Sequence, residues 1–449
     1  MKKVLIITYY WPPSGGSGVQ RWVKFSKYLP SHGWQPVIYT PENPALTAVD
    51  ATLQADIPPE AVVIRRPIRE IYALYHRLSG KKDAVRGEVN PIHARRKSGL
   101  QRLALYLRGN AFIPDPRVSW VRPSVRFLRR YLAAHPVDLI VSTGPPHSMH
   151  LIARKVAAAT GTPWVADFRD PWTKMFYFKH LQLSPWAERK HRRLEREVLD
   201  AADAVVAVSP LVQEEFQAMT QTPVHLITNG FDADDFTEPP RADGFFNVTH
   251  TGLFAADGNP DRLWEVLGEH CRRDEAFRDR LRIRLAGKTD PEIIAAIRAA
   301  GLGANLCDAG YCAHPEAVRE QQKASVLLLP LRKEPEYRAT LPGKLFEYLA
   351  AGAPLLGIGQ SDGAMARIVN ETGAGTVCDW EDRAAIEAFI DRCWTDWQTA
   401  GAGSGAAQAG EEESAPESAF RPAVAAYSRE RLTETMAALM EQVAGTARI

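Results

Sequence analysis

Residues 325–358 read SVLLLPLRKEPEYRATLPGKLFEYLAAGAPLLGI, and this order of residues predicts a strand, a loop, a helix and a second strand. The apolar run Val326–Leu329 is followed by proline, which is typical of a buried parallel strand that ends there. Pro342 and Gly343 then open a helix that Gly352 ends, and a second apolar run follows. This unit favours an open α/β sheet, in which ligands bind at the carboxyl ends of the strands.

The predicted helix carries Lys344 and Glu347 close to its amino end. The cation suits a phosphate group, which the amino end of a helix also attracts. A carboxylate accepts hydrogen bonds from sugar hydroxyls. Because a nucleotide sugar offers both kinds of group, this helix is predicted to bind one.

The rest of the chain repeats the alternation of strands and helices. Its 449 residues are too many for one ordinary core, so two domains are expected. The alternation predicts an α/β fold with two Rossmann-like, doubly wound parallel sheets in tandem. The expected strands lie at 4–9, 36–40, 61–65, 139–142, 164–166 and 204–208, and then at 247–251, 281–286, 310–312, 325–330, 355–358 and 375–378.

Four segments follow from this pattern. We expect a first Rossmann-like domain over residues 1–230 and a second over 231–400. Residues 400–420 are rich in Gly, Ala, Ser and Glu, which predicts a low-complexity loop. The chain closes with an amphipathic helix within 425–449, which we expect to pack back on the first domain.

Charge is unevenly distributed along the chain. An apolar share of 45% and a charged share of 24% are typical of a soluble globular protein, and no apolar run is long enough to cross a bilayer. Residues 64–130, however, hold far more Lys and Arg than Asp and Glu, interleaved with apolar and aromatic residues. This pattern predicts peripheral contact with an anionic membrane or a groove for a lipid-linked acceptor, and ordinary amphipathic helices are the alternative. No nucleic-acid recognition module is apparent.

The five cysteines are odd in number and all lie in the second half. Cys307 and Cys312 are close in sequence, but no second pair or histidine cluster completes a zinc site. Reduced thiols and a cytoplasmic location are therefore predicted, and the basic stretch 64–130 predicts association with the inner face of the membrane.

The first predicted strand runs into SGGSG at residues 14–18. This turn lacks the GxGxxG spacing of dinucleotide-binding proteins, so a nicotinamide cofactor is not expected. Gly15 and Gly16 would let the backbone approach a ligand and present amides to phosphate or sugar oxygens. A tight strand-to-helix turn is the alternative.

Two polar loops follow later strands of the first domain. His147 lies in STGPPHSMH, where it could hydrogen-bond a substrate hydroxyl or be merely structural. Asp167, Arg169 and Asp170 lie in ADFRDPW, where they could act in catalysis or form an Arg–Asp pair that staples the loop. We expect these loops to face the acceptor.

Further cations follow strands of the second domain. Lys288 comes after one strand and Gly287, and Arg338 lies in the loop before Lys344. Such cations would neutralise a diphosphate leaving group without a metal. Surface charge that only contacts solvent is the alternative.

Taken together and in order, the motifs resemble the family 4 glycosyltransferases of GT-B fold, in the form typical of bacterial cell-surface polysaccharide synthesis. The resemblance covers nearly the whole chain. The matching pieces are YYWPPSGGSGVQR, DLIVSTGPPHSMHLIA, PWVADFRDPW, HLITNGFDADDF, VTHTGLFA, IRLAG, SVLLLPL, LPGKLFEYLAAGAPLL and YSRERLTETM.

The resemblance implies two Rossmann-like domains facing across a cleft, with the acceptor on the first and the nucleotide sugar on the second. It also implies transfer with retention of configuration, without a metal or other cofactor. The family signature is two Glu residues separated by seven; Glu347 matches the second, which would bind the ribose, and Ala339 stands at the first. The Asp-x-Asp triplet within FDADDF at 231–236 follows a turn rather than a buried strand, so capping is preferred to metal binding.

The predicted function is a retaining glycosyltransferase that moves a sugar from a nucleoside-diphosphate sugar to a glycan or lipid-linked acceptor. A GT-B nucleotide-sugar epimerase and a catalytically silent nucleotide-binding or scaffold protein are the alternatives, the latter encouraged by Ala339. The predicted catalytic residues are His147, Asp167, Arg169 and Asp170, and the predicted donor-binding residues are Gly15, Gly16, Gly252, Lys288, Arg338, Gly343, Lys344, Leu345 and Glu347.

Overall fold

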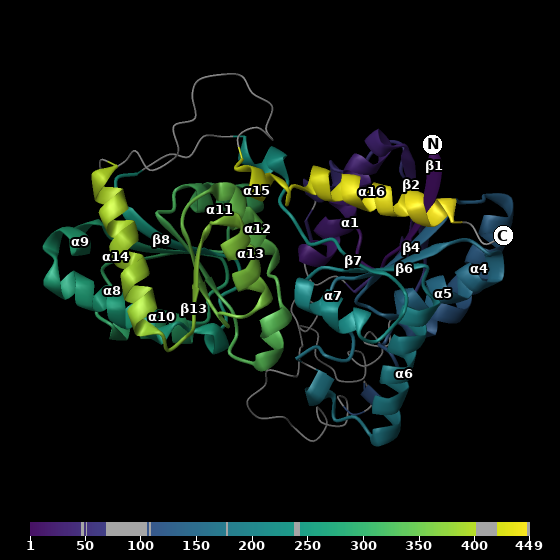
Figure 1. Ribbon diagram of the computed structural model, residues 1–449, viewed down its shortest axis with the longest axis horizontal. Coiled ribbons are helices and arrows are strands. Elements are labelled where there is room, and N and C mark those ends of the chain that lie inside the picture. The colour runs from purple at the N-terminus through teal and green to yellow at the C-terminus, as the bar shows by residue number, and fades with distance from the viewer. Residues whose placement is uncertain are drawn as a thin grey trace. The chain divides into compact units, whose positions relative to one another are not determined.

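The computed structural model forms two compact units, each built on one parallel sheet (Figure 1). The first comprises Met1–Thr228 with Glu430–Ile449, and the second comprises Asn229–Arg429. The structure describes residues 1–45, 49–50, 52–68, 106, 109–176, 178–237, 243–400 and 420–446.

The sheet of the first unit has the strand order β3-β2-β1-β4-β5-β6-β7, all parallel. The order reverses between β1 and β4, so the loops that follow these two strands diverge there and leave room for a ligand. The strands are β1 Lys2–Ile7, β2 Trp34–Pro41, β3 Val62–Arg66, β4 Leu139–Gly144, β5 Trp164–Phe168, β6 Ala204–Ala207 and β7 Val224–Leu226.

Helices cover this sheet, and the last helix of the chain is one of them. Apolar residues of α16 (Arg429–Gly445), among them Met436 and Met440, share a core with Val4, Trp22 and Trp34. The yellow helix in Figure 1 is therefore part of the first unit, although it follows the second unit in sequence. The other helices are α1 Ser17–Tyr28, α4 Val118–Ala134, α5 Ser148–Thr160, α6 Pro185–Ala201 and α7 Pro210–Gln217.

The second sheet has the order β10-β9-β8-β11-β12-β13 and reverses between β8 and β11. Its strands are β8 Phe246–Thr251, β9 Leu281–Ala286, β10 Leu306–Gly310, β11 Val326–Pro330, β12 Leu355–Ile358 and β13 Gly375–Cys378. Its helices are α8 Asp261–Arg273, α9 Glu275–Arg280, α10 Pro291–Ala299, α11 His314–Gln322, α12 Gly343–Ala351, α13 Ala364–Thr372, α14 Arg383–Thr399 and α15 Pro422–Ala425.

The predicted fold class is confirmed, and the segment that opened the sequence analysis forms β11, α12 and β12. Gly352 ends α12 with a left-handed φ of 79°, which a residue with a Cβ adopts only at a cost. Three strands differ from expectation. The strand expected at 4–9 lies at Lys2–Ile7. The strand expected at 310–312 lies at Leu306–Gly310, because Gly310 turns the chain with a φ of 63°, and β7 was not predicted.

Two predictions fall partly outside the described residues. Most of the basic stretch 64–130 and nearly all of the low-complexity segment 400–420 belong to the parts of the chain that the structure does not describe. Within the described part of the basic stretch, α4 buries Trp120 and Leu128. No helix among the described residues has the length and apolarity that a bilayer-spanning helix needs.

Candidate functional site

Lys344 and Glu347 lie where the order of the second sheet reverses. Both are on α12, which follows β11, and Gly252 follows the neighbouring strand β8. The Lys344 Nζ donates to the carbonyl of Thr251 (2.6 Å) and approaches that of Leu253 (3.4 Å). Burial lowers the pKa of Lys344 to about 8.

His250, which the sequence analysis did not single out, also holds this lysine. The residue is 2% exposed, and burial together with the charge of Lys344 lowers its pKa to about 3, so it is neutral. Its Nδ1 lies 2.9 Å from the carbonyl of Leu328, whereas its Nε2 lies 3.3 Å from the carbonyl of Leu253, so the shorter contact favours the proton on Nδ1. Its Nε2 therefore accepts a hydrogen bond from Lys344 (3.2 Å).

Glu347 is held by Gln321 of α11. The Gln321 side chain is fully buried, and its Nε2 donates to the Glu347 Oε2 (3.0 Å) and the Thr251 Oγ1 (3.1 Å). No described residue donates a hydrogen bond to the other carboxylate oxygen of Glu347. Gln321 could not be predicted from sequence, because it is one polar residue within a polar helix.

Two glycines bring the loops after β8 and β9 together. Gly252 has a φ of 85°, and a Cβ at Gly287 would lie 2.2 Å from the carbonyl oxygen of Gly252. A Cβ at Gly252 would lie 3.1 Å from the Lys344 Nζ, so a side chain there would crowd the lysine. Lys288 follows Gly287 and is exposed, and its carbonyl accepts from Phe254 N (3.0 Å).

The loop before α12 directs its cations to acidic partners. Arg338 is exposed and its Nε donates to the Asp362 Oδ2 (3.0 Å), while Arg332 pairs with Asp257 (3.2 Å). Ala339 ends the short 3₁₀ helix η6 (Pro335–Ala339). The described partner of Arg338 is thus an exposed carboxylate, and its contact with a donor stays a prediction.

Part of the backbone at the start of α12 already makes hydrogen bonds within the protein. Gly343 is the first residue of the helix, and no side chain caps its amino end. The amide of Leu345 donates to the carbonyl of Pro342 (3.0 Å), and the Leu345 side chain is fully buried. Gly343 and Lys344 thus lie at the positive end of the α12 dipole, and Leu345 anchors the first turn of this helix.

In the first unit the glycine-rich turn packs against the segment near Asp50. A Cβ at Gly15 would lie 2.9 Å from the Asp50 Cβ, and Ser14 bridges to Val49. Gly16 has a φ of 95° and precedes the first residue of α1. This geometry favours the tight-turn interpretation of Gly15, while contact of either glycine with a ligand stays a prediction.

His147 lies at the amino end of α5, buried beside aromatic rings. It stacks on Trp172 with ring centroids 4.7 Å apart, and its residue is 4% exposed. Neither ring nitrogen has a hydrogen-bond partner among the described residues. Burial, with the charges of His150 and Arg169, holds its pKa well below the usual value, so a neutral imidazole is available to accept or donate one hydrogen bond.

Asp167 is enclosed in the core beneath the loop. Its carboxylate accepts from Arg21 (Nη2–Oδ1 2.8 Å), Trp22 (Nε1–Oδ2 2.8 Å) and Thr143 (Oγ1–Oδ2 2.8 Å). Burial alone would raise its pKa, but Arg21 and these hydrogen bonds lower it overall, so it is ionised. The stapling alternative is therefore favoured for Asp167, with Arg21 rather than Arg169 as its partner.

Arg169 and Asp170, the other two charged residues of this loop, have different surroundings. Arg169 donates to the carbonyls of Gly18 and Pro145, which ties the loops after β4 and β5 to the first turn of α1, and burial lowers its pKa. Asp170 is half-buried, and burial raises its pKa to about 6 despite the nearby charge of Arg169. Of the three predicted charges, Asp170 has the properties of a group that exchanges a proton near neutral pH.

No group of three or more His, Cys, Asp or Glu side chains among the described residues is arranged to hold a metal ion. In the predicted turn, Asp232 caps the 3₁₀ helix η4 (Ala233–Phe236) by accepting from Asp234 N (3.3 Å). Asp235 lies 3.2 Å from the Nε2 of His314. The predicted capping role is confirmed.

Comparisons with known proteins identify the fold that the two sheets belong to. A family model described as Glycosyltransferase Family 4 matches residues 88–235. Among solved structures, a sucrose-phosphate synthase from Thermosynechococcus elongatus is 15% identical over 99% of this chain and 98% of its own, with a TM-score of 0.57. At this identity the likeness concerns the fold, which is GT-B.

Two further solved structures share this architecture. WaaG, a glycosyltransferase involved in lipopolysaccharide biosynthesis, is 16% identical over 99% of each chain, with a TM-score of 0.51. A putative UDP-N-acetylglucosamine 2-epimerase from Listeria monocytogenes is 12% identical over 98% of this chain and 96% of its own, with a TM-score of 0.54. No curated protein matches the sequence.

Proposed function

We propose that this protein is a retaining glycosyltransferase that moves a sugar from a nucleoside-diphosphate sugar to a glycan or lipid-linked acceptor. The observation that carries the proposal is the pair Lys344 and Glu347 on one helix, at the point where the strand order of the second sheet reverses. Lys344 lies there beside Gly252, in the loop after β8. Open α/β sheets bind ligands at such points. The matched family segment supports the same reaction class.

The two residues of this pair would bind different parts of the donor. Lys344, with the amino end of α12, would neutralise the diphosphate, which becomes the leaving group as the glycosidic bond breaks. Glu347 would accept hydrogen bonds from ribose hydroxyls through its oxygen that Gln321 does not occupy. Arg338 would have to leave Asp362 to approach the phosphates, and Lys288 is exposed to solvent, so we assign both a smaller contribution to donor binding.

The acceptor would be held by the first unit. His147, neutral and without a hydrogen-bond partner among the described residues, would bind an acceptor or donor hydroxyl. Asp170 would contact the acceptor, whereas Asp167 and Arg169 would hold the loop in place. The leaving phosphate would assist in removing the proton of the acceptor hydroxyl, so that the protein supplies position and charge without a metal.

The first test is calorimetry with uridine and guanosine diphosphates. We expect one of them, or another nucleoside diphosphate, to bind the full chain. Lys344→Ala and Glu347→Ala should each weaken this binding by about 1–3 kcal/mol, the usual loss for a hydrogen bond to a charged group. The matched control is Lys333→Ala, an exposed cation of the same unit that pairs with Glu381 (3.9 Å) and should bind normally.

The outcomes separate the alternatives. If no nucleoside diphosphate binds, the transferase proposal is wrong. If a nucleoside-diphosphate sugar exchanges the hydrogen at C2 of its sugar with solvent in the absence of any acceptor, the protein is an epimerase. Normal affinity in both Lys344→Ala and Glu347→Ala would refute the site while leaving the reaction class open.

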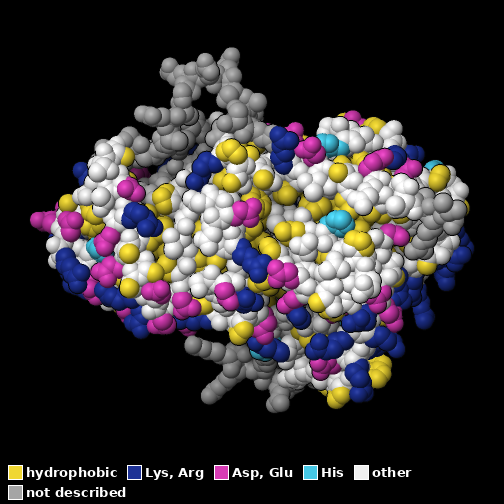
Figure 2. Space-filling model, in the orientation of Figure 1, with side chains coloured by type: hydrophobic (Ala, Val, Ile, Leu, Met, Phe, Trp, Pro, Cys, Tyr) yellow, Lys and Arg dark blue, Asp and Glu magenta, His cyan; other side chains and the backbone are white. Residues whose placement is uncertain are grey.

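We also propose a cytoplasmic location with peripheral contact to the inner membrane face and a part in cell-surface polysaccharide synthesis. The basic stretch 64–130 motivates this. A second basic surface lies outside that stretch, on α6, where Trp186, Arg189 and Arg196 are exposed. Dark blue side chains gather over this helix in Figure 2. Tryptophan with arginines on one helix suits an anionic lipid interface.

Vesicle sedimentation tests this contact. The protein should sediment with phosphatidylglycerol vesicles at low ionic strength and be released by about 0.5 M salt, because surface charge attraction is screened. It should not sediment with neutral phosphatidylcholine vesicles. Absence of binding to anionic vesicles at low salt would end the membrane proposal without affecting the donor site.

A further inference from the structure

Gln321 of α11 is a polar residue in a fully buried position, and its amide is only partly hydrogen-bonded. The side chain is completely buried, and its Oε1 has no hydrogen-bond partner among the described residues. Burying an amide with an unsatisfied oxygen has a cost in stability, so an apolar residue would suit the fold better. Both hydrogens of its Nε2, in contrast, are used by Thr251 and Glu347.

The direction of this amide is set by charge. Rotating the amide by half a turn would give its oxygen a partner in the Thr251 hydroxyl but would place it against the carboxylate of Glu347. Since two acceptors repel, Nε2 must face Glu347. The amide is therefore oriented for the carboxylate and not for the core.

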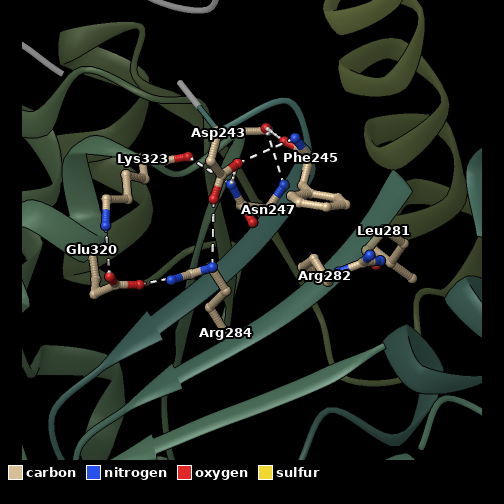
Figure 3. Close-up of polar contacts among 9 residues, drawn as sticks. Asp243, Phe245, Asn247, Leu281, Arg282, Arg284, Glu320 and Lys323 are labelled. Carbon is tan, nitrogen blue, oxygen red and sulfur yellow. Dashed lines mark hydrogen bonds and ion pairs between the residues drawn. The ribbon is translucent and has the colours of Figure 1, made fainter. Parts of the chain in front are cut away.

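The helix that carries Gln321 is fixed by a network of charges on the preceding residue, drawn in Figure 3. Glu320 accepts from the Arg284 Nε of β9 (2.6 Å) and the Nζ of Lys323 (3.1 Å). Arg284 also reaches Asp243 (3.5 Å), and Asn247 of β8 donates to the carbonyl of Lys323 (3.1 Å). The last turn of α11 is thus tied to two strands of the sheet.

We propose that Gln321 is a positioning residue for the donor ribose: it holds the Glu347 Oε2 so that Oε1 is presented to the ribose hydroxyls. This inference rests on the proposed function, in which Glu347 binds the ribose. Gln321 does not contact the nucleotide in this scheme. Its contribution is that Glu347 does not need to be ordered when the nucleotide binds.

The test compares uridine diphosphate, or guanosine diphosphate if only that binds, with its 2′,3′-dideoxy analogue. The measured quantity is the ratio of the two affinities in the full chain. Gln321→Met keeps the volume but removes the donor. It should weaken ribonucleotide binding about tenfold and leave the dideoxy analogue within about twofold, because only the ribose contact is affected.

Two controls separate positioning from a general structural effect. Gln322→Met makes the same substitution one residue along α11 and should leave the ratio unchanged. In a Glu347→Ala background, Gln321→Met should add no further loss of affinity, since the contact it supports is already gone. A purely structural role would weaken both nucleotides alike.

Gln321→Glu adds a pH readout and does not depend on the methionine variant folding well. Two carboxyl groups about 3 Å apart share one proton, and the protonated form donates as the amide does. The ratio should therefore be close to that of the wild type near pH 5.5 and fall by pH 8, while the wild-type ratio stays flat. Charged or titratable groups on the elements packed against α11 are Lys344, Glu347 and Tyr348 of α12, His250 of β8, Arg282 and Arg284 of β9, and Asp234 and Asp235 of η4.

These groups are the same in both proteins and act on both nucleotides, so the comparison with wild type removes their effect. An unchanged ratio in Gln321→Met, or a flat ratio with pH in Gln321→Glu, would overturn the inference. A wild-type protein that binds both nucleotides equally would overturn it too, together with the ribose role of Glu347. Absence of any nucleotide binding would instead refute the proposed function.

Discussion

Replacing Arg21 by methionine is expected to destabilise the first unit by about 3–5 kcal/mol, the usual cost of removing one partner of a buried ion pair. Arg21 and Asp167 are both fully buried, and Arg21 also donates to the carbonyls of Thr228 (2.6 Å) and Ile227 (2.8 Å). Methionine would leave the carboxylate without a cation and both carbonyls without a donor. Denaturant unfolding followed by tryptophan fluorescence measures this change, since Trp22 donates to Asp167.

The matched control is Arg192→Met on α6. Arg192 and its partner Glu188 are both largely exposed, and such pairs contribute about 0.3–0.5 kcal/mol. A loss at Arg21 no larger than that at Arg192 would contradict the assignment of Asp167 as the anchor of the loop. The unfolding transition of the second unit should not move in either variant, because both arginines belong to the first unit.

The effect of Arg21→Met should also depend on pH. In the wild type the pKa of Asp167 is lowered from its ordinary value of 3.8, so its stabilising contribution is full above that value and is lost only at lower pH. Without Arg21, burial would raise the pKa above that of the unfolded chain, and protonation would then relieve the penalty as pH falls. The difference between variant and wild type is therefore largest at neutral pH and shrinks toward about pH 4.

The elements that the sequence predicts well are those set by local pattern. Buried parallel strands appear as short apolar runs, so Leu281–Ala286 and Leu355–Ile358 could be placed to the residue. The edge strand Leu306–Gly310 was misplaced because its middle residues are exposed and carry no apolar run. The short strand Val224–Leu226 was missed for a similar reason, since it has only three residues.

The candidate site shows the same limit. The placement of Lys344 and Glu347 on one helix could be predicted because their spacing is a local property of the sequence. Arg21 and Gln321 could not, because their partners Asp167 and Glu347 are 146 and 26 residues away. Only folding brings a donor in a polar helix to a carboxylate on another element.

The affinity for a nucleoside diphosphate is expected to fall about tenfold between pH 7 and pH 9, because the lysine that meets the phosphates loses its proton in this range. Burial lowers the pKa of Lys344 to about 8 in the free protein. A bound diphosphate favours the charged form and raises this pKa, so binding above pH 7 takes up a proton. Affinity is therefore highest below pH 8 and decreases as pH rises through that value.

Lys344→Arg is the control that isolates this group, because arginine stays protonated throughout the range. Its affinity should be nearly flat from pH 7 to pH 9, even if it is lower overall. His250 does not contribute, since its pKa of about 3 keeps it neutral at every pH tested. Calorimetry at pH 8 in two buffers of different ionisation enthalpy should detect about half a proton taken up by the wild type and none by Lys344→Arg. An equal pH dependence in both proteins would mean that another group meets the phosphates, and Lys344 would then be no more than a support for the loop after β8.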